Sequence, residues 1–217
     1  MVNDKSSHLA WLSLLSQHRS IAVIRASSLL LGSQMAQAVA QGGISVIEIT
    51  WNSSQAPELI SQLRSELPTC IIGTGTILNR EQLQQAIAAG AQFLFTPHVD
   101  RTLIEAAVAK DVPIIPGALS PTEIITAWQA GASCVKVFPI QAVGGASYIK
   151  ALQGPLGSIP LIPTGGVTLN NAQEFIKAGA IAVGLAGDLF PKALIADGDW
   201  EAITQRAKSL RQSTKIV

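Results

Sequence analysis

The stretch NREQLQQAIAAGAQFLFTP, residues 79–97, contains one complete repeating unit of this chain. Its first part has the pattern of a helix of about a dozen residues, and Asn79 stands where an N-cap residue belongs. Gly90 follows at a place where a helix C-terminus favours positive φ. The run QFLFTP (92–97) then has the apolar character of a strand that is buried on both faces. The stretch therefore predicts a helix that leads directly into a strand of a parallel sheet.

The same unit recurs along the chain, with strand starts spaced by roughly 20–25 residues. Ser120 and Asn170 occupy further N-cap positions. Gly131 and Gly179 occupy further helix C-termini. Eight strand-like runs result, namely IAVIRA (21–26), SVIEIT (45–50), CIIGTGT (70–76), QFLFTP (92–97), VPIIPG (112–117), CVKVFP (134–139), PLIPTG (160–165) and IAVGLAG (181–187).

Eight such units, with no linker rich in Pro, Ser or charge between them, predict a (β/α)8 barrel in one domain spanning residues 1–217. The segment MVNDKSSHLAWLSLLSQHRS (1–20) lacks the layout of a signal peptide, and it predicts an extra amphipathic helix at the N-terminus. An open, doubly wound sheet is the alternative fold. That fold would normally contain fewer strands, and no G-x-G-x-x-G motif follows the first run.

The composition excludes several classes of partner. The net charge is +1 and Lys and Arg are scattered singly, which argues against nucleic-acid binding. The longest apolar runs are shorter than the ~20 residues of a membrane span. Cys70 and Cys134 lie singly in apolar runs, which indicates reduced core thiols in a cytoplasmic protein. Charged residues make up 13% of the chain, against about 25% in a typical soluble domain, so we expect other subunits to cover part of the surface.

Charged residues inside the strand-like runs are rare, and barrel enzymes place their active sites at the C-terminal ends of strands. Of the 29 charged residues (15 Lys and Arg plus 14 Asp and Glu), only Arg25, Glu48 and Lys136 lie in these runs. Lys136 is flanked by two valines, so burial is expected to lower its pKa and supply the neutral amine that attacks a carbonyl group. The alternative is a buried Lys136–Glu48 ion pair that only fixes the core.

Glu48 and Arg25 have chemistry that complements a reactive lysine. Glu48 has apolar neighbours in VIEIT, and a raised pKa in that setting would let it act as both acid and base. The planar guanidinium of Arg25 suits a carboxylate. The alternative for Arg25 is a pairing with Glu48 that serves only the structure.

Two glycine-rich turns, PTGGV (163–167) and GLAGD (184–188), end the seventh and eighth runs. Barrels hold phosphate at these two places through backbone N–H groups. The three histidines are His8, His18 and His98, and no cluster of His, Asp and Glu has the spacing of metal ligands, so no metal is expected. His98 at the mouth of the fourth strand is either a substrate contact or a solvated loop residue.

Several of these segments together resemble the family of 2-keto-3-deoxy-6-phosphogluconate (KDPG) aldolases, which also act on 4-hydroxy-2-oxoglutarate (KHG). The resemblance covers roughly residues 18–195. The related 2-keto-3-deoxy-6-phosphogalactonate aldolases are similar as well, especially over EITWNS and GLAGDLF. The segments that carry the resemblance are AVIRA, GGISVIEITWNS, IGTGTILN, FTPHVD, IPGALSPTEI, VKVFPIQAVGGASYIKALQGPLG, IPTGGV and VGLAGDLF.

The resemblance implies cleavage of KDPG to pyruvate and D-glyceraldehyde 3-phosphate, or of KHG to pyruvate and glyoxylate, without a cofactor and in a homotrimer. Its only small-molecule partner would be the 2-keto acid. Lys136 matches the Schiff-base lysine, Glu48 the acid/base glutamate, and Arg25 the arginine that binds the pyruvate carboxylate. Thr76 matches a threonine near that carboxylate. The other matched positions line the pocket or the phosphate site, and they are Pro97, Phe138, Thr164, Gly165, Gly166, Ala186 and Gly187.

Two positions depart from the family pattern. Asn52 stands where some members carry an arginine, and Ala186-Gly187 replaces a Gly-Ser pair, so one hydroxyl that would contact phosphate is missing. Preference for a phosphorylated substrate is therefore left open. Two rival functions use the same fold: a sugar-phosphate epimerase in which Glu48 and Lys136 only move protons, and a non-catalytic barrel that binds phosphate. Borohydride reduction with pyruvate separates them, because only the aldolase retains a pyruvyl group.

Overall fold

The computed structural model describes the backbone of residues 5–215 and the side chains of residues 9–215. The strands are β1 (Ser20–Ile24), β2 (Val46–Thr50), β3 (Ile71–Gly75), β4 (Leu94–Phe95), β5 (Ile114–Ile115), β6 (Gly117–Ala118), β7 (Val135–Val137), β8 (Leu161–Pro163) and β9 (Val183–Leu185). The helices are α1 (Lys5–His18), α2 (Leu29–Gln41), α3 (Ala56–Glu66), α4 (Arg80–Ala88), α5 (Arg101–Val108), α6 (Pro121–Gln129), the 3-10 turn η1 (Ile140–Val143), α7 (Ala146–Leu156), α8 (Ala172–Lys177), α9 (Lys192–Asp197) and α10 (Trp200–Thr214).

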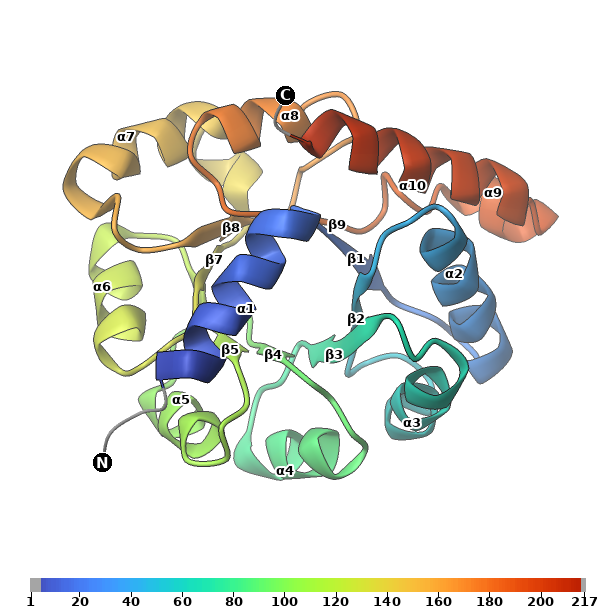
Figure 1. The fold of residues 1–217 in the computed structure, drawn as a ribbon, viewed down its shortest axis with the longest axis horizontal. Helices are drawn as coiled ribbons and strands as arrows, with labels where there is room; N and C mark the ends of the chain where they lie inside the picture. Colours follow the sequence, from blue (N-terminus) through green and yellow to red (C-terminus); the bar gives the residue numbers. More distant parts are fainter. Residues whose placement is uncertain (1–4, 216–217) are drawn as a thin grey trace.

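The strands form a closed parallel barrel. Six of them follow the order β5-β4-β3-β2-β1-β9, and three follow the order β6-β7-β8. Pro116 separates β5 from β6, which are two halves of one strand run, and a parallel bridge between Thr164 and Gly184 joins β8 to β9. The helices surround this ring (Figure 1). The (β/α)8 barrel is therefore confirmed, and the open doubly wound sheet is wrong because the sheet closes on itself.

Alternate residues of each strand face opposite sides of the barrel wall. In β1, Ala22 and Ile24 belong to the core between the wall and the helices, whereas Ile21 belongs to a separate core inside the barrel. This inner core is completed by one or two residues from six of the other seven strand runs and by two from α1, namely Val46, Phe93, Phe95, Ile115, Cys134, Ile162, Ala182, Trp11 and Leu15.

Helix α1 covers the N-terminal end of the barrel, and Figure 1 shows it lying across the ring of strands. Its buried Trp11 packs against Phe93 with ring centroids 5.2 Å apart and ring planes tilted by 34°, and Phe93 meets Phe95 edge to face at 5.8 Å. The predicted N-terminal helix is confirmed over residues 5–18, and residues 1–4 of that prediction lie outside the described part. The interior is therefore filled and closed at this end.

The signals at the helix ends are confirmed with one exception. The side chain of Asn79 accepts a hydrogen bond from Gln82 N, and Ser120 forms a reciprocal capping box with Glu123. The prediction for Asn170 is wrong, because Asn171 is the residue that directly precedes α8. The Oδ1 atom of Asn171 accepts a hydrogen bond from Thr168 N at 2.7 Å, which closes a turn over residues 168–171 before the helix starts. The three helix-ending glycines have positive φ, at 93° for Gly90, 101° for Gly131 and 105° for Gly179.

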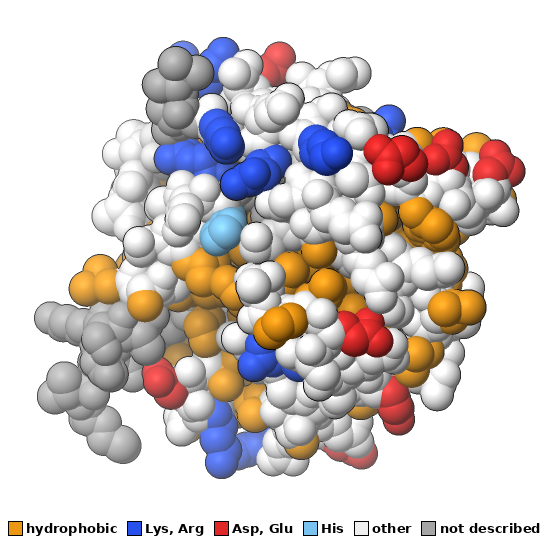
Figure 2. Space-filling view, turned by 45° about the vertical axis from the view of Figure 1, so that its right-hand side comes forward, with side chains coloured by type: hydrophobic (Ala, Val, Ile, Leu, Met, Phe, Trp, Pro, Cys, Tyr) orange, Lys and Arg blue, Asp and Glu red, His pale blue; other side chains and the backbone are white. Residues whose placement is uncertain are grey.

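Several strands are shorter than their apolar runs. The run 92–97 forms a regular strand only at Leu94–Phe95. Single backbone hydrogen bonds extend beyond it at both ends, since Gln92 N donates to Ile72 O at 2.8 Å and Thr96 N donates to Ile115 O at 3.3 Å. Cys70 and Cys134 are both buried free thiols, as predicted. No helix within residues 5–215 is long and apolar enough to cross a membrane. Figure 2 shows several Lys and Arg side chains gathered beside a histidine, so the cations are less evenly spread than the sequence indicates.

Candidate active site

The inward-facing positions change character toward the C-terminal ends of the strands. Continuing the alternation of β2 from Val46 places Glu48 on the inner face, and continuing that of β7 from Cys134 places Lys136 there. Glu48 lies between Val23 and Gly73 of the neighbouring strands. Both ionisable side chains are almost fully buried, at 2% exposure for Glu48 and 6% for Lys136. The barrel thus brings the two predicted catalytic residues into one interior.

Lys136 has apolar and aromatic surroundings. Its Nζ lies 4.6 Å from the ring centre of Phe138 and 5.6 Å from that of Phe95. Burial lowers the pKa of Lys136; the negative charge of Glu48 opposes this shift, and the positive charge of Arg25 adds to it. A larger share of the lysine is therefore neutral near pH 7 than for a lysine in water, and only the neutral amine is a nucleophile.

Glu48 experiences the opposite shift. Burial raises its pKa, while the positive charges of Lys136 and Arg25 act to lower it. Neither Lys136 nor Arg25 approaches the carboxylate as an ion pair, because the only salt bridge within residues 9–215 joins Arg206 to Asp188. The alternatives based on a Lys136–Glu48 or an Arg25–Glu48 ion pair therefore find no contact in this structure.

Gly75 is a part of the site that the sequence did not reveal. A Cβ atom added at Gly75, the last residue of β3, would overlap Oε1 of Glu48. Only glycine leaves room for the carboxylate at this point. The only sequence signal for this contact was the pair of glycines in IGTGT. Glycine is unusual inside a buried strand, and it often marks a place where another group approaches the backbone closely.

Arg25 lies differently from its prediction. It follows β1 by one residue and its side chain is exposed, so it is not a buried charge within a strand. Its Nε donates a hydrogen bond to Oδ1 of Asn52 at 3.2 Å. Asn52, the position at which the chain departs from the family pattern, therefore holds the guanidinium at the barrel mouth.

Thr76 has an unusual backbone. It follows β3 with φ of 63°, the left-handed region that a β-branched residue rarely adopts. Such strain is found where the surrounding structure fixes a residue, and it concentrates at functional sites. Pro97 and Phe138 are both half-buried at the ends of their runs, and His98 is exposed. The structure thus places Thr76, Pro97 and Phe138 at the same end of the barrel as Lys136.

The two glycine-rich turns lie next to each other at this end. Thr164 is buried and pairs with Gly184 across the β8–β9 seam. Gly165 and Gly166 follow with φ of 83° and 100°, a conformation that turns backbone groups outward without steric cost.

Asp188 connects the two turns, and the sequence analysis did not identify it as a site residue. Its Oδ2 accepts a hydrogen bond from Leu169 N at 2.9 Å and pairs with Arg206 of α10 at 3.3 Å. Asn171 fixes the first turn from within, because its Nδ2 donates to Gly166 O at 3.1 Å. These contacts fix the backbone that follows the seventh and eighth strand runs.

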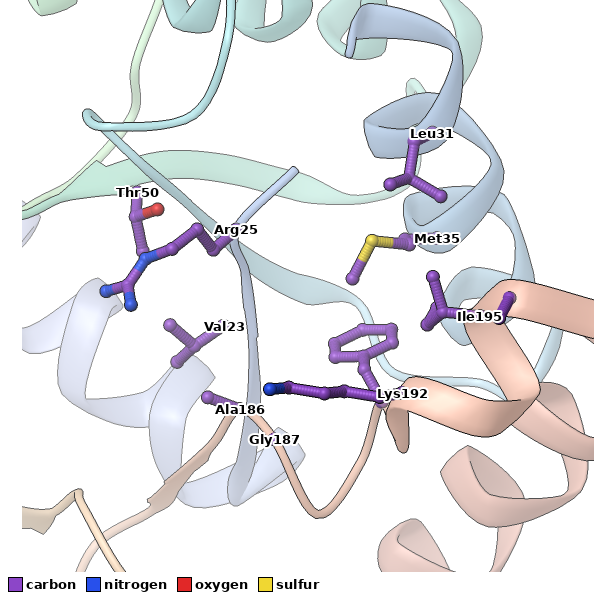
Figure 3. A pocket seen from close by; sticks show the side chains of 11 residues that line it. Val23, Arg25, Leu31, Met35, Thr50, Ala186, Gly187, Lys192 and Ile195 are labelled. Carbon is purple, nitrogen blue, oxygen red and sulfur yellow. The ribbon is translucent and has the colours of Figure 1, made fainter. Parts of the chain in front are cut away.

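A pocket of about 530 Å³ opens between β1, α2 and α9. Figure 3 shows Arg25 and Thr50 entering it from the barrel and Lys192 entering from α9. Glu48 and Lys136 lie deeper inside the barrel and do not line it. No group of three or more His, Cys, Asp and Glu within the described residues is arranged to hold a metal ion. The pocket is lined by Val23, Arg25, Leu31, Met35, Thr50, Ala186, Gly187, Phe190, Lys192, Ile195 and Ala196.

Comparison with known proteins gives a consistent result. Residues 12–206 match the family model described as KDPG and KHG aldolase. The chain is 36% identical over 183 residues to a 2-dehydro-3-deoxy-phosphogluconate aldolase of Treponema pallidum (strain Nichols), which covers 84% of this chain and 87% of that protein.

Two solved structures support the same relationship. A KDPG aldolase from Legionella pneumophila, with pyruvate captured as a covalent carbinolamine, superposes with a TM-score of 0.85 and 29% identity over 92% of this chain and 97% of that one. A structure described as native KDPGal superposes with a TM-score of 0.82 and 32% identity over 89% of this chain and 93% of that one. The chain therefore belongs to the KDPG and KHG aldolase family, whose members are carbon–carbon lyases.

Proposed function

We propose that this protein is a class I aldolase that cleaves KDPG to pyruvate and D-glyceraldehyde 3-phosphate and KHG to pyruvate and glyoxylate, with Lys136 as the Schiff-base nucleophile and Glu48 as the acid and base. The observation that carries the proposal is the buried amine of Lys136, whose pKa is lowered and which shares the barrel interior with a buried carboxylate. No cofactor is needed, because the protonated imine itself withdraws electrons.

The reaction begins at Lys136. The neutral amine attacks the C2 ketone of the 2-keto acid, and the resulting carbinolamine loses water to give an iminium ion. Glu48, directly or through a water molecule, removes the proton from the C4 hydroxyl. The C3–C4 bond then breaks, its electron pair moves toward the iminium nitrogen, and an aldehyde leaves.

The enamine that remains is resolved by the same two groups. Glu48 returns a proton to C3, which regenerates the iminium ion, and water attacks C2 to release pyruvate and the free amine of Lys136. A buried carboxylate whose pKa is raised can carry a proton between these two steps. Glu48 is therefore assigned both transfers.

Two anionic ends of the substrate require binding groups. We assign the 2-keto acid carboxylate to Arg25 and Thr76, since the guanidinium offers a planar pair of donors at the barrel mouth. We assign the phosphate to backbone N–H groups of Gly165, Gly166 and the Ala186–Gly187 turn. Pro97, Phe138 and Thr164 would line the carbon chain between these ends.

A KDPGal aldolase is the second candidate, and it shares this chemistry but differs in the configuration at C4. It is favoured by the similarity to the structure described as native KDPGal, which superposes with a TM-score of 0.82 and 32% identity. Steady-state comparison of gluconate-derived, galactonate-derived and unphosphorylated substrates decides between the two.

The decisive experiment is borohydride reduction in the presence of pyruvate, followed by peptide mass spectrometry. The proposal requires one pyruvyl adduct on Lys136 and release of pyruvate from the 2-keto acid substrate. An epimerase or a non-catalytic phosphate-binding barrel would acquire no adduct. An adduct on another lysine, or none, would overturn the assignment.

For the assembled protein we propose a cytoplasmic homotrimer with one aldolase domain per chain, acting in carbohydrate metabolism. The low charged content of 13% supports covered surface. Figure 2 shows hydrophobic side chains exposed across the middle of one face. Light scattering should therefore give about three times the 22.7 kDa chain mass, as expected for a closed symmetric oligomer. A mass equal to one chain would contradict the trimer.

A further inference from the structure

Lys192 lines the pocket at the barrel mouth and has no role in the chemistry described above. It is the first residue of α9, its side chain is exposed, and it makes no hydrogen bond or ion pair with residues 9–215. Figure 3 shows its ammonium group directed toward Ala186, whereas Arg25 enters from the β1 side with Val23 between them. Two cations thus face one pocket from separate walls.

The remaining lining offers nothing to neutralise these charges. No Asp or Glu is among the described residues that line the pocket. Ala186 and Gly187 have no polar side chain, and the hydroxyl of Thr50 already exchanges a hydrogen bond with Ser53 at 3.2 Å. The rest of the wall is apolar, with Leu31, Met35, Phe190, Ile195 and others. A pocket with two cations and no acid selects an anionic ligand.

We propose that Lys192 is a specificity-determining residue that pairs with the phosphate at the far end of the aldehyde half of the substrate. This inference rests on the proposed aldolase function. Arg25 is held by Asn52 on the β2 side and is assigned to the 2-keto acid carboxylate. The phosphate, the second anion of the substrate, is therefore assigned to the opposite wall of the pocket, which contains Lys192. Lys192 stands beside the Ala186–Gly187 turn, where the side chains provide no donor for a phosphate.

The expected strength of this contact is moderate. An apolar wall displaces water and strengthens an ion pair. The exposure of Lys192 weakens it through solvent screening. A hydrogen bond between charged groups at such a partly screened site corresponds to about a tenfold change in binding.

The test compares Lys192→Gln, Lys192→Arg and the control Lys208→Gln, in which an exposed lysine is changed near Gly42 at the other end of the barrel. Each variant is assayed with KDPG and with its dephosphorylated counterpart. For Lys192→Gln we expect KM for KDPG to rise about tenfold, with kcat and the kinetics of the dephosphorylated substrate unchanged. Lys192→Arg should restore most of the loss, and Lys208→Gln should behave as wild type.

Inorganic phosphate provides a readout that does not depend on turnover. It should inhibit competitively, and its inhibition constant should rise in Lys192→Gln in parallel with KM for KDPG. Equal KM values for KDPG in wild type and Lys192→Gln would overturn the proposal. A loss with KHG instead of KDPG would also overturn it, because the distal anion would then be a carboxylate.

Borohydride trapping with pyruvate keeps this test separate from the proposed function. Pyruvate lacks the aldehyde half, so the adduct on Lys136 should form equally in wild type and Lys192→Gln. Absence of the adduct in wild type would refute the aldolase itself. Normal trapping with unchanged discrimination between KDPG and its dephosphorylated counterpart would refute only the role of Lys192.

Discussion

The two ends of the barrel interior are built from the same strands but differ in almost every physical property. At the N-terminal end, Trp11, Phe93 and Ile21 fill the space and α1 closes it. At the C-terminal end, Glu48 and Lys136 replace apolar side chains on the same inward face. One strand, β2, contributes Val46 to the first layer and Glu48 to the second, only two residues apart.

This difference indicates how the molecule separates stability from chemistry. A layer of close-packed aromatic and aliphatic side chains gains free energy from burial. Two buried ionisable groups cost free energy, because each is desolvated without an ion pair. The N-terminal layer therefore stabilises a C-terminal layer that would be unfavourable alone. Mutations in the N-terminal layer should lower the unfolding free energy, whereas mutations in the C-terminal layer should mainly lower turnover.

The largest expected effect is on turnover in Lys136→Met. Loss of a catalytic nucleophile lowers kcat by about 10⁵–10⁶, and borohydride trapping of pyruvate should disappear. The unfolding free energy should stay equal or rise, because an apolar side chain of similar length replaces a desolvated ammonium. Thermal unfolding and trapping measured on the same sample check both parts. Measurable trapping would contradict the role of Lys136 as the nucleophile. A large loss of stability would contradict the proposal that the C-terminal layer costs free energy.

Glu48→Gln should produce the next largest effect. Loss of general acid–base catalysis lowers kcat by about 10²–10⁴, whereas the amine of Lys136 still forms a Schiff base. Deuterium exchange at C3 of pyruvate, followed by NMR, isolates the proton transfer from bond cleavage. Exchange at the wild-type rate would remove Glu48 from its assigned role.

Phe93→Ala tests the opposite end. Phe93 is fully buried between Trp11 and Phe95, so its truncation should cost about 3–5 kcal/mol of unfolding free energy. Denaturant unfolding measures the loss, and kcat below the new melting temperature should change little. Phe138→Leu in the other layer is the matched comparison, and it should lower activity with a smaller loss of stability. Equal losses of activity in both variants would contradict the comparison.

Arg25→Lys should weaken binding of the 2-keto acid by about 1.5–3 kcal/mol, because an ammonium cannot replace a pair of guanidinium donors on a carboxylate. Inhibition by pyruvate and KM for the substrate measure the effect, while kcat and the shape of its pH profile stay nearly fixed. If KM were unchanged and the pH optimum displaced, Arg25 would act on Glu48 rather than on the substrate.

The smallest expected effect is a pH shift. Because the pKa of Lys136 is lowered from 10.5, pyruvate trapping should rise by about tenfold per pH unit and level off below the pH at which an ordinary lysine deprotonates. The negative charge of Glu48 raises the pKa of Lys136, so in Glu48→Gln the midpoint should move to lower pH. A midpoint that stays fixed, or that moves to higher pH, would show that the two groups do not interact as described.

Stability should follow the same pKa shift with a defined sign. Between the lowered pKa of folded Lys136 and the value of 10.5 in the unfolded chain, the unfolded state binds more protons, so the contribution of Lys136 to stability increases with pH. Lys136→Met should remove this slope. Denaturant unfolding across the alkaline range measures it.

Much of this organisation is encoded locally. The repeat of helix, glycine and apolar run predicts eight βα units because capping, positive φ and burial are properties of short segments. A lone lysine between two valines predicts a reactive amine because desolvation needs only apolar neighbours. The sequence alone therefore determined the barrel, and it predicted Lys136 and Glu48, which the structure buries in the barrel interior.

The tertiary structure decided what depends on contacts between distant segments. Gly75 matters because Glu48 of the adjacent strand lies over it, and Asp188 because Leu169 and Arg206 reach it from other elements. The pocket that joins Arg25 to Lys192 exists only because barrel closure brings β9 beside β1. The periodicity of one segment does not reveal which side chains of other segments will contact it. The residues at the mouth of the barrel could therefore be identified only from the closed structure.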